Sequence, residues 1–202
     1  MAVKDHALDG RIIEAATAEF LAHGFQKASL HKIAERAGIT TGALYTRYQN
    51  KDDLFCSLVR GLMGEIAARM GHTAALYQAA HDSRSADAFL QAIRAEEKIY
   101  LDLLDTHYDA CVLLFCKSGG SSLEAMMHRM MTEKARQTKA FFRSIARRPI
   151  DFDGIELILS QQFSYYQQLL TRGDSREKAV SCMETVDIFL AAGWKAIFDQ
   201  IL

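Results

Sequence analysis

Residues 29–51 read SLHKIAERAGITTGALYTRYQNK, and this stretch decides how the chain around it is interpreted. Ser29 precedes apolar residues at helical spacing, and Gly38 allows the backbone to turn after them. Thr40 then opens a second helix, over about 41–47, that displays mostly polar side chains. Two short helices joined by a tight turn that contains glycine predict a helix-turn-helix.

The flanks of this stretch extend the pattern. An amphipathic helix ends at Gly24-Phe25, and it is followed by Ser29, Ile33-Ala34, Ala37-Gly38, Thr41-Gly42-Ala43-Leu44-Tyr45, Tyr48, Lys51 and Leu54-Phe55. Together these residues resemble the DNA-binding segment of the tetracycline-repressor (TetR) family, over residues 11–55. The resemblance implies repression that is relieved by a small molecule held among the middle helices.

The composition predicts an all-α fold. Half of the 202 residues are hydrophobic, and there is one proline and 12 glycines. Apolar periodicity predicts about nine helices, over 8–23, 30–37, 41–47, 50–78, 86–104, 107–117, 122–147, 153–171 and 174–202. We expect a helix-turn-helix domain over 1–52 and a larger effector-binding and dimerisation domain over 53–202.

The sequence contains no segment that predicts membrane insertion or export. No apolar run approaches the ~20 uncharged residues that cross a bilayer. The N-terminus, MAVKDHALDG, lacks the apolar segment of a signal peptide. We therefore expect a cytoplasmic protein.

Four cysteines, Cys56, Cys111, Cys116 and Cys182, lie within apolar helical patterns. They show no C-x-x-C pairing and no cysteine-histidine spacing of a zinc site. We expect four buried thiols, no metal site and no cofactor, while a redox role of Cys111 or Cys116 stays open.

Positive charge is concentrated in one part of the chain, although the net charge is −1. Residues 26–51 hold five basic residues and one acidic residue, a local balance of +4 to which His31 can add. Attraction to phosphate acts over ~8–10 Å in physiological salt, so the local balance matters more than the total. This segment is therefore the expected nucleic-acid surface.

The second short helix carries the candidates for contact with base edges. An arginine can pair bidentately with guanine, a threonine methyl can lie against a thymine methyl, and a glycine lets the backbone approach closely. The expected set is Thr41, Gly42, Thr46 and Arg47, with Ala43 between them on the same helix. A plain surface charge is the alternative for Arg47.

Phosphate contacts are expected from neighbouring groups. These are the hydroxyls of Ser29 and Tyr45, the cap region at Thr40 and the Lys51 ammonium, with Lys27, His31 and Tyr48 as further candidates. Core packing is the alternative for both tyrosines. Thr41 stands where the family often has lysine or glutamine, and Arg47 where it often has histidine or tyrosine, so the operator sequence stays open.

The last two helices, about 153–172 and 175–202, are apolar on two faces. Two apolar faces need two partners, and a second copy of the chain is one of them. The resemblance implies a four-helix bundle across a dimer axis. Because one short recognition helix reads few base pairs, we expect a homodimer on palindromic double-stranded operator DNA. The helix that begins near residue 50 follows without a linker and is the natural lever between the two domains.

Large apolar residues on the middle helices are the candidate effector contacts. They are Met63, Met70, Tyr100, Leu104, Phe115, Met127, Met130, Phe163 and Tyr166. Adaptable methionines suit an apolar or aromatic effector, whose identity stays open. Ordinary core packing is the alternative for each of them, and His107 and His128 are either recognition groups or ordinary surface or core residues.

Arg136, Lys139, Arg143 and Arg147 fall on one face of the helix over 122–147. A solvated face, an acidic partner or effector, and pairing with acids elsewhere in the fold are the three explanations.

Three other classes of protein are alternatives to a regulator. A helical-bundle enzyme with a di-metal centre needs duplicated E-x-x-H pairs, and none occurs. The sequence also has no P-loop, G-x-S-x-G, G-x-G-x-x-G or H-E-x-x-H motif. A helical adaptor that binds only protein has no use for the polar set around Thr41 and Arg47, whereas a small-molecule binding protein without regulatory DNA binding stays as an alternative. We expect a transcriptional regulator that is not an enzyme.

Overall fold

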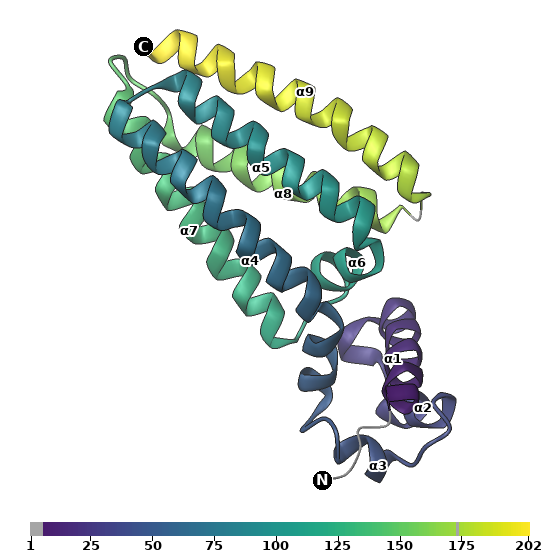
Figure 1. The fold of residues 1–202 in the computed structure, drawn as a ribbon. Helices are drawn as coiled ribbons and strands as arrows, with labels where there is room; N and C mark the ends of the chain where they lie inside the picture. The colour runs from purple at the N-terminus through teal and green to yellow at the C-terminus, as the bar shows by residue number, and fades with distance from the viewer. Residues whose placement is uncertain (1–5, 173) are drawn as a thin grey trace. The chain divides into compact units, whose positions relative to one another are not determined.

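The computed structural model describes residues 6–172 and 174–202, and these residues form nine α-helices and no strands (Figure 1). The helices are α1 (His6–Lys27), α2 (Leu30–Arg36), α3 (Thr41–Tyr45), α4 (Lys51–Ser83), α5 (Ala86–Thr106), α6 (Tyr108–Cys116), α7 (Ser122–Ile145), α8 (Phe152–Thr171) and α9 (Arg176–Ile201). The predicted all-α fold with a helix-turn-helix near its N-terminus is confirmed. Helix α3 ends two residues earlier than expected, and α4 runs five residues further.

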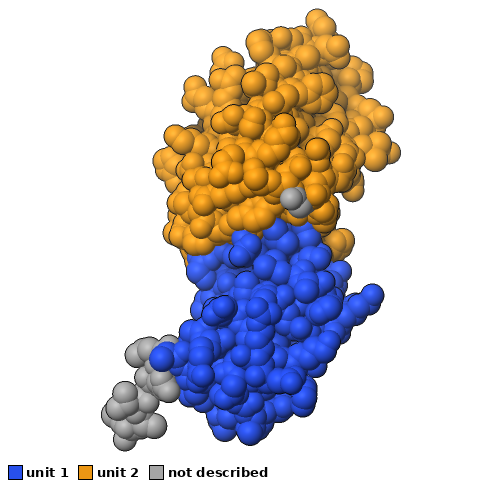
Figure 2. Space-filling model, turned by 90° about the vertical axis from the view of Figure 1, so that its right-hand side faces the viewer, with its two compact units in different colours: residues 1–62, 109–126 blue, residues 63–108, 127–202 orange. Residues whose placement is uncertain are grey.

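The chain divides into two compact units, which are coloured separately in Figure 2. Unit 1 combines residues 1–62 with residues 109–126, and unit 2 combines residues 63–108 with residues 127–202. Helices α4 and α7 each begin in unit 1 and end in unit 2. The predicted boundary at residue 52 concerns function and stays a prediction.

The core of unit 1 is built around three phenylalanines. The ring of Phe20 lies edge-on to that of Phe55, 4.9 Å away, and Phe25 lies 5.3 Å from Phe55. Gly24 has a φ of 70°, which breaks α1 and turns Phe25 toward these rings. The Phe25 amide then donates a hydrogen bond to the Lys117 carbonyl, at 2.8 Å.

Side-chain caps form where the sequence predicts them. Ser29 accepts a hydrogen bond from the Lys32 amide at 3.4 Å, and Thr40 accepts one from the Ala43 amide at 3.1 Å. Between these two caps, Gly38 has a φ of 69°, which makes the tight turn from α2 to α3. The helix-turn-helix is therefore fixed by local hydrogen bonds and by one glycine.

The start of α7 differs from the prediction. The Ser121-x-x-Glu124 sequence predicts a capping box there, but the buried Ser121 hydroxyl has no hydrogen-bond partner among the described residues. Instead, the Asp52 carboxylate accepts hydrogen bonds from the Ser122 amide at 2.9 Å and from the Ser122 hydroxyl at 2.6 Å. A charged carboxylate is the stronger acceptor, so it outcompetes the local hydroxyl.

The core of unit 2 is an aromatic cluster between α5, α7 and α9. Phe89 stacks on Phe141 with ring centroids 4.2 Å apart, and Phe142 stacks on Phe198 at 5.0 Å. Trp194 is tilted against Phe142 at 5.6 Å, and its side chain is almost fully buried. Helix α9 runs alongside α5 (Figure 1), so its buried stripe forms one wall of this core.

The basic face of α7 is largely engaged within the chain. Arg136 pairs with Glu133 at 2.6 Å, and Lys139 pairs with Glu156 on α8. The Arg143 guanidinium lies 4.6 Å from the centre of the Phe152 ring. Pairing with an acid elsewhere in the fold is thus the explanation that applies to Lys139.

The four cysteines form no disulfide within the described residues. Cys111 is buried, but Cys56, Cys116 and Cys182 are only partly buried, so the expectation of four buried thiols is wrong for three of them. Burial raises the pKa of Cys111 to about 12 and that of Cys116 to about 11. Both thiols therefore stay protonated near neutral pH, which makes them poor nucleophiles.

Within the described ranges, no helix is both long enough and apolar enough to cross a membrane.

Candidate functional site

Helix α3 presents its polar residues outward. All five of its residues are described, and Leu44, which anchors the helix in the core of unit 1, is the buried one. Tyr45 is 53% exposed, Gly42 is exposed, and Thr41 and Ala43 are partly exposed. The helix is thus held by one apolar side chain and the Thr40 cap, and its other faces remain open to a partner.

The residues that follow α3 continue this surface. Thr46 and Arg47 are both exposed. The Thr46 hydroxyl donates a hydrogen bond to the Ala43 carbonyl at 2.7 Å, which holds its side chain against the end of α3. The structure therefore brings the predicted base-reading residues together on one short helix and its C-terminal end.

Arg47 is engaged within the protein. Its Nε lies 3.0 Å from Oδ1 of Asp9 on α1, and both side chains are about one-third exposed. Asp9 lies 38 residues before Arg47, and no local sequence motif predicts that the two residues pair. Any contact of Arg47 with a base has to compete with this carboxylate.

Lys51 also has a partner within unit 1. Its ammonium donates a hydrogen bond to the Gln26 carbonyl at 3.0 Å and lies 5.1 Å from the centre of the Phe25 ring. Desolvation lowers the pKa of Lys51, partly offset by the negative charge of Glu19. Lys51 therefore links the start of α4 to the end of α1, so it has a structural role as well as its predicted role in phosphate contact.

The other phosphate candidates lie around this helix-turn-helix. The Ser29 hydroxyl serves as the cap of α2, and the Ser29 amide donates to Glu19 at 2.9 Å. Lys27 and His31 are exposed, and Tyr48 is partly buried.

A small pocket lies in unit 2. It is lined by Tyr77, Phe89, Ile93, Glu96, Glu97, Tyr100, Lys134, Thr138, Leu159 and Trp194. Its free space is close to that of a single water molecule. A larger ligand therefore requires the surrounding helices to move.

Glu96 makes contacts with three other residues that line this pocket. It accepts hydrogen bonds from Tyr77 at 2.6 Å and from Tyr100 at 3.3 Å, and it pairs with Lys134. Burial opposes its ionisation, but the Lys134 charge and the hydrogen bonds outweigh burial and lower the pKa of Glu96. Glu96 is thus an ionised and fully partnered group in an apolar setting.

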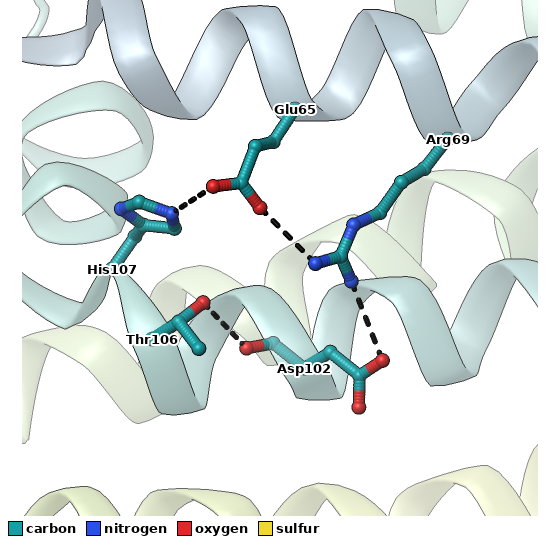
Figure 3. A network of polar contacts seen from close by, with 5 residues as sticks. All are labelled: Glu65, Arg69, Asp102, Thr106 and His107. Carbon is teal, nitrogen blue, oxygen red and sulfur yellow. Dashed lines mark hydrogen bonds and ion pairs between the residues drawn. The ribbon is translucent and has the colours of Figure 1, made fainter.

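A second polar network links α4 to the C-terminal end of α5 within unit 2 (Figure 3). Glu65 lies 2.7 Å from Nε2 of His107 and 3.1 Å from Arg69. Arg69 in turn lies 3.3 Å from Asp102. The hydrogen bond with His107 is the largest of the effects that lower the pKa of Glu65. Figure 3 shows Glu65 between the imidazole and the guanidinium, so this network joins α4 to the C-terminal end of α5.

A family model described as bacterial regulatory proteins of the tetR family matches residues 12–58, which contain the helix-turn-helix. This segment of the chain is therefore similar to the tetR family of bacterial regulatory proteins. The fatty acid metabolism regulator protein of Bacillus subtilis is 35% identical over 60 residues, which are 30% of this chain and 31% of that protein. The HTH-type transcriptional repressor SCO4008 of Streptomyces coelicolor is 40% identical over 68 residues, which are 33% of this chain and 35% of that protein. The chain thus matches only about a third of the length of these curated relatives.

Solved TetR-like structures share the whole fold. A TetR-like regulator from Rhodococcus sp. RHA1 matches with a TM-score of 0.57 and 17% identity, over 95% of this chain and 100% of that chain. FadR from Bacillus subtilis, in complex with stearoyl-CoA, matches with a TM-score of 0.55 and 17% identity, over 92% of this chain and 98% of that chain. At these identities the likeness concerns the fold, and the ligand is a property of FadR.

The predicted effector residues do not gather around one pocket. Tyr100 lines the pocket, and the Tyr166 ring packs against the Tyr100 ring with centroids 5.2 Å apart. The others do not line it: Met63, Met70 and Met127 are partly buried, Leu104 is buried, Met130 is 37% exposed and Phe115 belongs to unit 1. The side chain of Phe163 lies outside the described part of the structure.

Sequence reasoning missed the polar lining of the pocket. Phe89, Ile93, Tyr100 and Leu104 define an apolar stripe on α5, and Glu96 and Glu97 fall on this same stripe. A charged residue inside an apolar stripe is buried by its neighbours, and a buried charge needs a partner or a function. These two acids within the apolar stripe were therefore the feature of the sequence from which the polar lining could have been predicted.

Proposed function

We propose that this chain is a ligand-responsive, DNA-binding transcriptional repressor that binds a palindromic operator as a homodimer. The observation that carries the proposal is α3, a capped helix with one buried residue and an exposed polar face within a segment of net charge +4. The family match to the same segment supports it, and so does the naming of one relative as a transcriptional repressor.

In this proposal, α3 and the residues after it enter the major groove. Thr41, Gly42, Thr46 and Arg47 read base edges, and Ala43 lies close to the DNA backbone. Ser29, Thr40, Tyr45 and Lys51 contact phosphates. Arg47 exchanges its ion pair with Asp9 for a base, which makes its contact depend on the sequence it meets.

A second copy of the chain covers apolar residues on α8 and α9. Leu157, Ile188 and Phe189 are between 68% and 73% exposed, which is costly for side chains of this size. Tyr166 is only 7% exposed, so it belongs to the core of unit 2 and is a poor choice for an interface variant. We therefore place the dimer interface at Leu157, Ile188 and Phe189.

A small-molecule effector is proposed to act through α4. The effector-binding and dimerisation domain is residues 53–202, and the DNA-binding domain is residues 1–52. Effector binding in unit 2 shifts α5, and the contacts of Glu65 and Arg69 pass that shift to α4. Helix α4 continues without a break to Lys51, next to the DNA-binding segment.

The test is selection of binding sites by the full chain from random double-stranded DNA. We expect enrichment of a palindrome, and binding to the selected site that weakens as salt rises. The control variant is Lys195→Ala, which removes an exposed positive charge on α9 and should bind like the unaltered chain. Enrichment of no sequence, or equal binding to the selected site and to scrambled DNA, would contradict the proposal.

A further inference from the structure

Four buried polar side chains of unit 2 have atoms without a hydrogen-bond partner among the described residues. These atoms are Oε1 of Glu97, both carboxyl oxygens of Asp187, the Tyr166 hydroxyl and Nε1 of Trp194. Glu97 is 5% exposed, Asp187 9%, Tyr166 7% and Trp194 2%. Leaving such groups unsatisfied costs stability, so a cluster of them calls for an explanation.

The acids of this cluster outnumber the nearby cations. Lys134 is already bound to Glu96, which also receives two tyrosine hydrogen bonds. Glu97, the next residue on α5, lines the same pocket and forms no ion pair with any described residue. Asp187 on α9 is close enough to act on the charge of Glu97. The charges of Lys134 and Arg94 act on Glu97, but no described cation forms an ion pair with Glu97 or Asp187.

The remaining walls of the pocket are aromatic. Tyr77, Phe89, Tyr100 and Trp194 line it, and Tyr166 lies against Tyr100. The faces of aromatic rings attract cations, most strongly where water is excluded. An anionic group is disfavoured there, because Lys134, the basic residue that lines the pocket, is already paired with Glu96.

We propose that this pocket binds an organic cation, with an ammonium or amidinium group held against Glu97 and Asp187 and an aromatic or aliphatic body among the rings. This inference rests on the proposed function in one respect, namely that the cation is the effector. The pocket holds little free space as it stands, so the cation binds a more open arrangement of unit 2. A ligand that favours a different arrangement is what a conformational switch requires.

The protonation of the acids agrees with this assignment. Burial raises the pKa of Glu97 to about 8 and that of Asp187 to about 6. The groups that act on Glu97 are Glu96 and Arg94 on α5, Lys134 on α7 and Asp187 on α9, and Glu184 on α9 acts on Asp187. Glu97 thus holds a proton at neutral pH, and a bound cation that favours its ionised form releases that proton.

The experiment is titration calorimetry of the full chain at pH 7 with matched probes. Benzamidinium, benzamide and benzoate have nearly the same shape and differ in charge, and hexylammonium and hexanol form an aliphatic pair. We expect each cation to bind at least about tenfold more tightly than its uncharged or anionic counterpart. Repeating the titration in buffers of different ionisation enthalpy should show net release of protons.

Two variants locate the site. Glu97→Gln and Asp187→Asn keep the side-chain shape and should each weaken binding of the cations about tenfold, with binding of benzamide and hexanol unchanged. Glu133→Gln is the matched control, because Glu133 is an exposed acid of the same unit that pairs with Arg136. Thermal melting of each variant shows that it is folded.

Three results would overturn the inference: cations that bind no better than their neutral counterparts, cation binding that survives both variants, or no cation binding at millimolar concentration. A separate measurement of operator binding distinguishes this inference from the proposed function. Cation binding that depends on Glu97 but does not change operator affinity leaves the site intact and removes its effector role. A chain that binds no operator refutes the proposed function, while the calorimetry still decides the site.

Discussion

The polar side chains around α3 in unit 1 and those around the pocket in unit 2 differ in burial. Around α3 the polar groups lie at the surface, and Arg47 and Lys51 make contacts within unit 1 while they remain within reach of solvent. In unit 2, Glu97 and Asp187 lie in the interior with unsatisfied oxygens. A rigid macromolecule such as DNA is met from outside, whereas a small ligand can be enclosed. The difference in burial therefore matches the difference in the size of the partners proposed for each unit.

The largest effect is expected from the buried acid. Below its ordinary pKa of 4.5, Glu97 is protonated in both the folded and unfolded chain, so its titration does not change stability with pH there. Between that value and about 8 the unfolded chain releases the proton and the folded chain keeps it, so stability falls as pH rises. We expect the unaltered chain to lose a few kcal/mol of unfolding free energy from pH 5 to pH 8, and Glu97→Gln to remove most of that loss. Chemical denaturation at both pH values measures it, and equal pH dependence of the two proteins would place the loss elsewhere.

Arg47→Ala tests the outer surface. It should cost roughly 1–3 kcal/mol of binding free energy on the cognate operator and relax discrimination at one base pair. Its effect on folding should stay below about 1 kcal/mol, because the pair with Asp9 is partly exposed. Fluorescence anisotropy on cognate and scrambled duplexes gives the comparison, with Lys195→Ala as the control. Equal losses on both duplexes would remove the base-reading role of Arg47.

Lys51→Ala should affect binding and stability together. We expect weaker binding to all DNA sequences, with the salt dependence reduced by about one unit of slope. Loss of the hydrogen bond to Gln26 and of the contact with the Phe25 ring should also cost about 1 kcal/mol of folding free energy. Salt titrations and denaturation curves separate the two effects. An unchanged salt slope would leave Lys51 with a structural role alone.

Gly42→Ala should move stability and binding in opposite directions. A methyl group at this position meets no atom closer than the Thr40 hydroxyl, at 3.8 Å, and alanine favours a helix by up to about 1 kcal/mol. The variant should therefore melt at a slightly higher temperature and bind the operator more weakly, if the α3 backbone approaches DNA closely. Ala43→Gly is the reciprocal control, which should lower the melting temperature. Unchanged operator affinity in Gly42→Ala would show that this backbone stays away from the bases.

The sequence predicted those features that depend on neighbouring residues. The caps at Ser29 and Thr40, the turn at Gly38 and the nine helices all follow from short-range patterns. The pairing of Arg47 with Asp9 joins residues 38 apart. The capping of α7 by Asp52 joins residues 70 apart. Such pairs depend on which helices meet, and helical periodicity alone does not say which helices those are.

The pocket of unit 2 was less predictable for a different reason. Methionines and aromatic residues fill any helical core, so their presence did not distinguish a ligand wall from ordinary packing. The pocket is distinguished by its polar residues, which are Glu96 and Glu97 on α5 and Lys134 on α7. They can be recognised as one group only once the packing of α5 against α7 is known.

The contact between Asp52 and the start of α7 also determines at which residues a hybrid protein can be joined. A graft that joins residues 1–52 to a foreign domain keeps Asp52 but loses Ser122, whose amide donates a hydrogen bond to the Asp52 carboxylate. It also loses the Lys117 carbonyl, which accepts a hydrogen bond from the Phe25 amide. The exchangeable part is therefore discontinuous: residues 1–62 have to travel with residues 109–126. A hybrid spliced at these three joints should fold where one spliced after residue 52 leaves the Phe25 amide and the first turn of α7 without their partners.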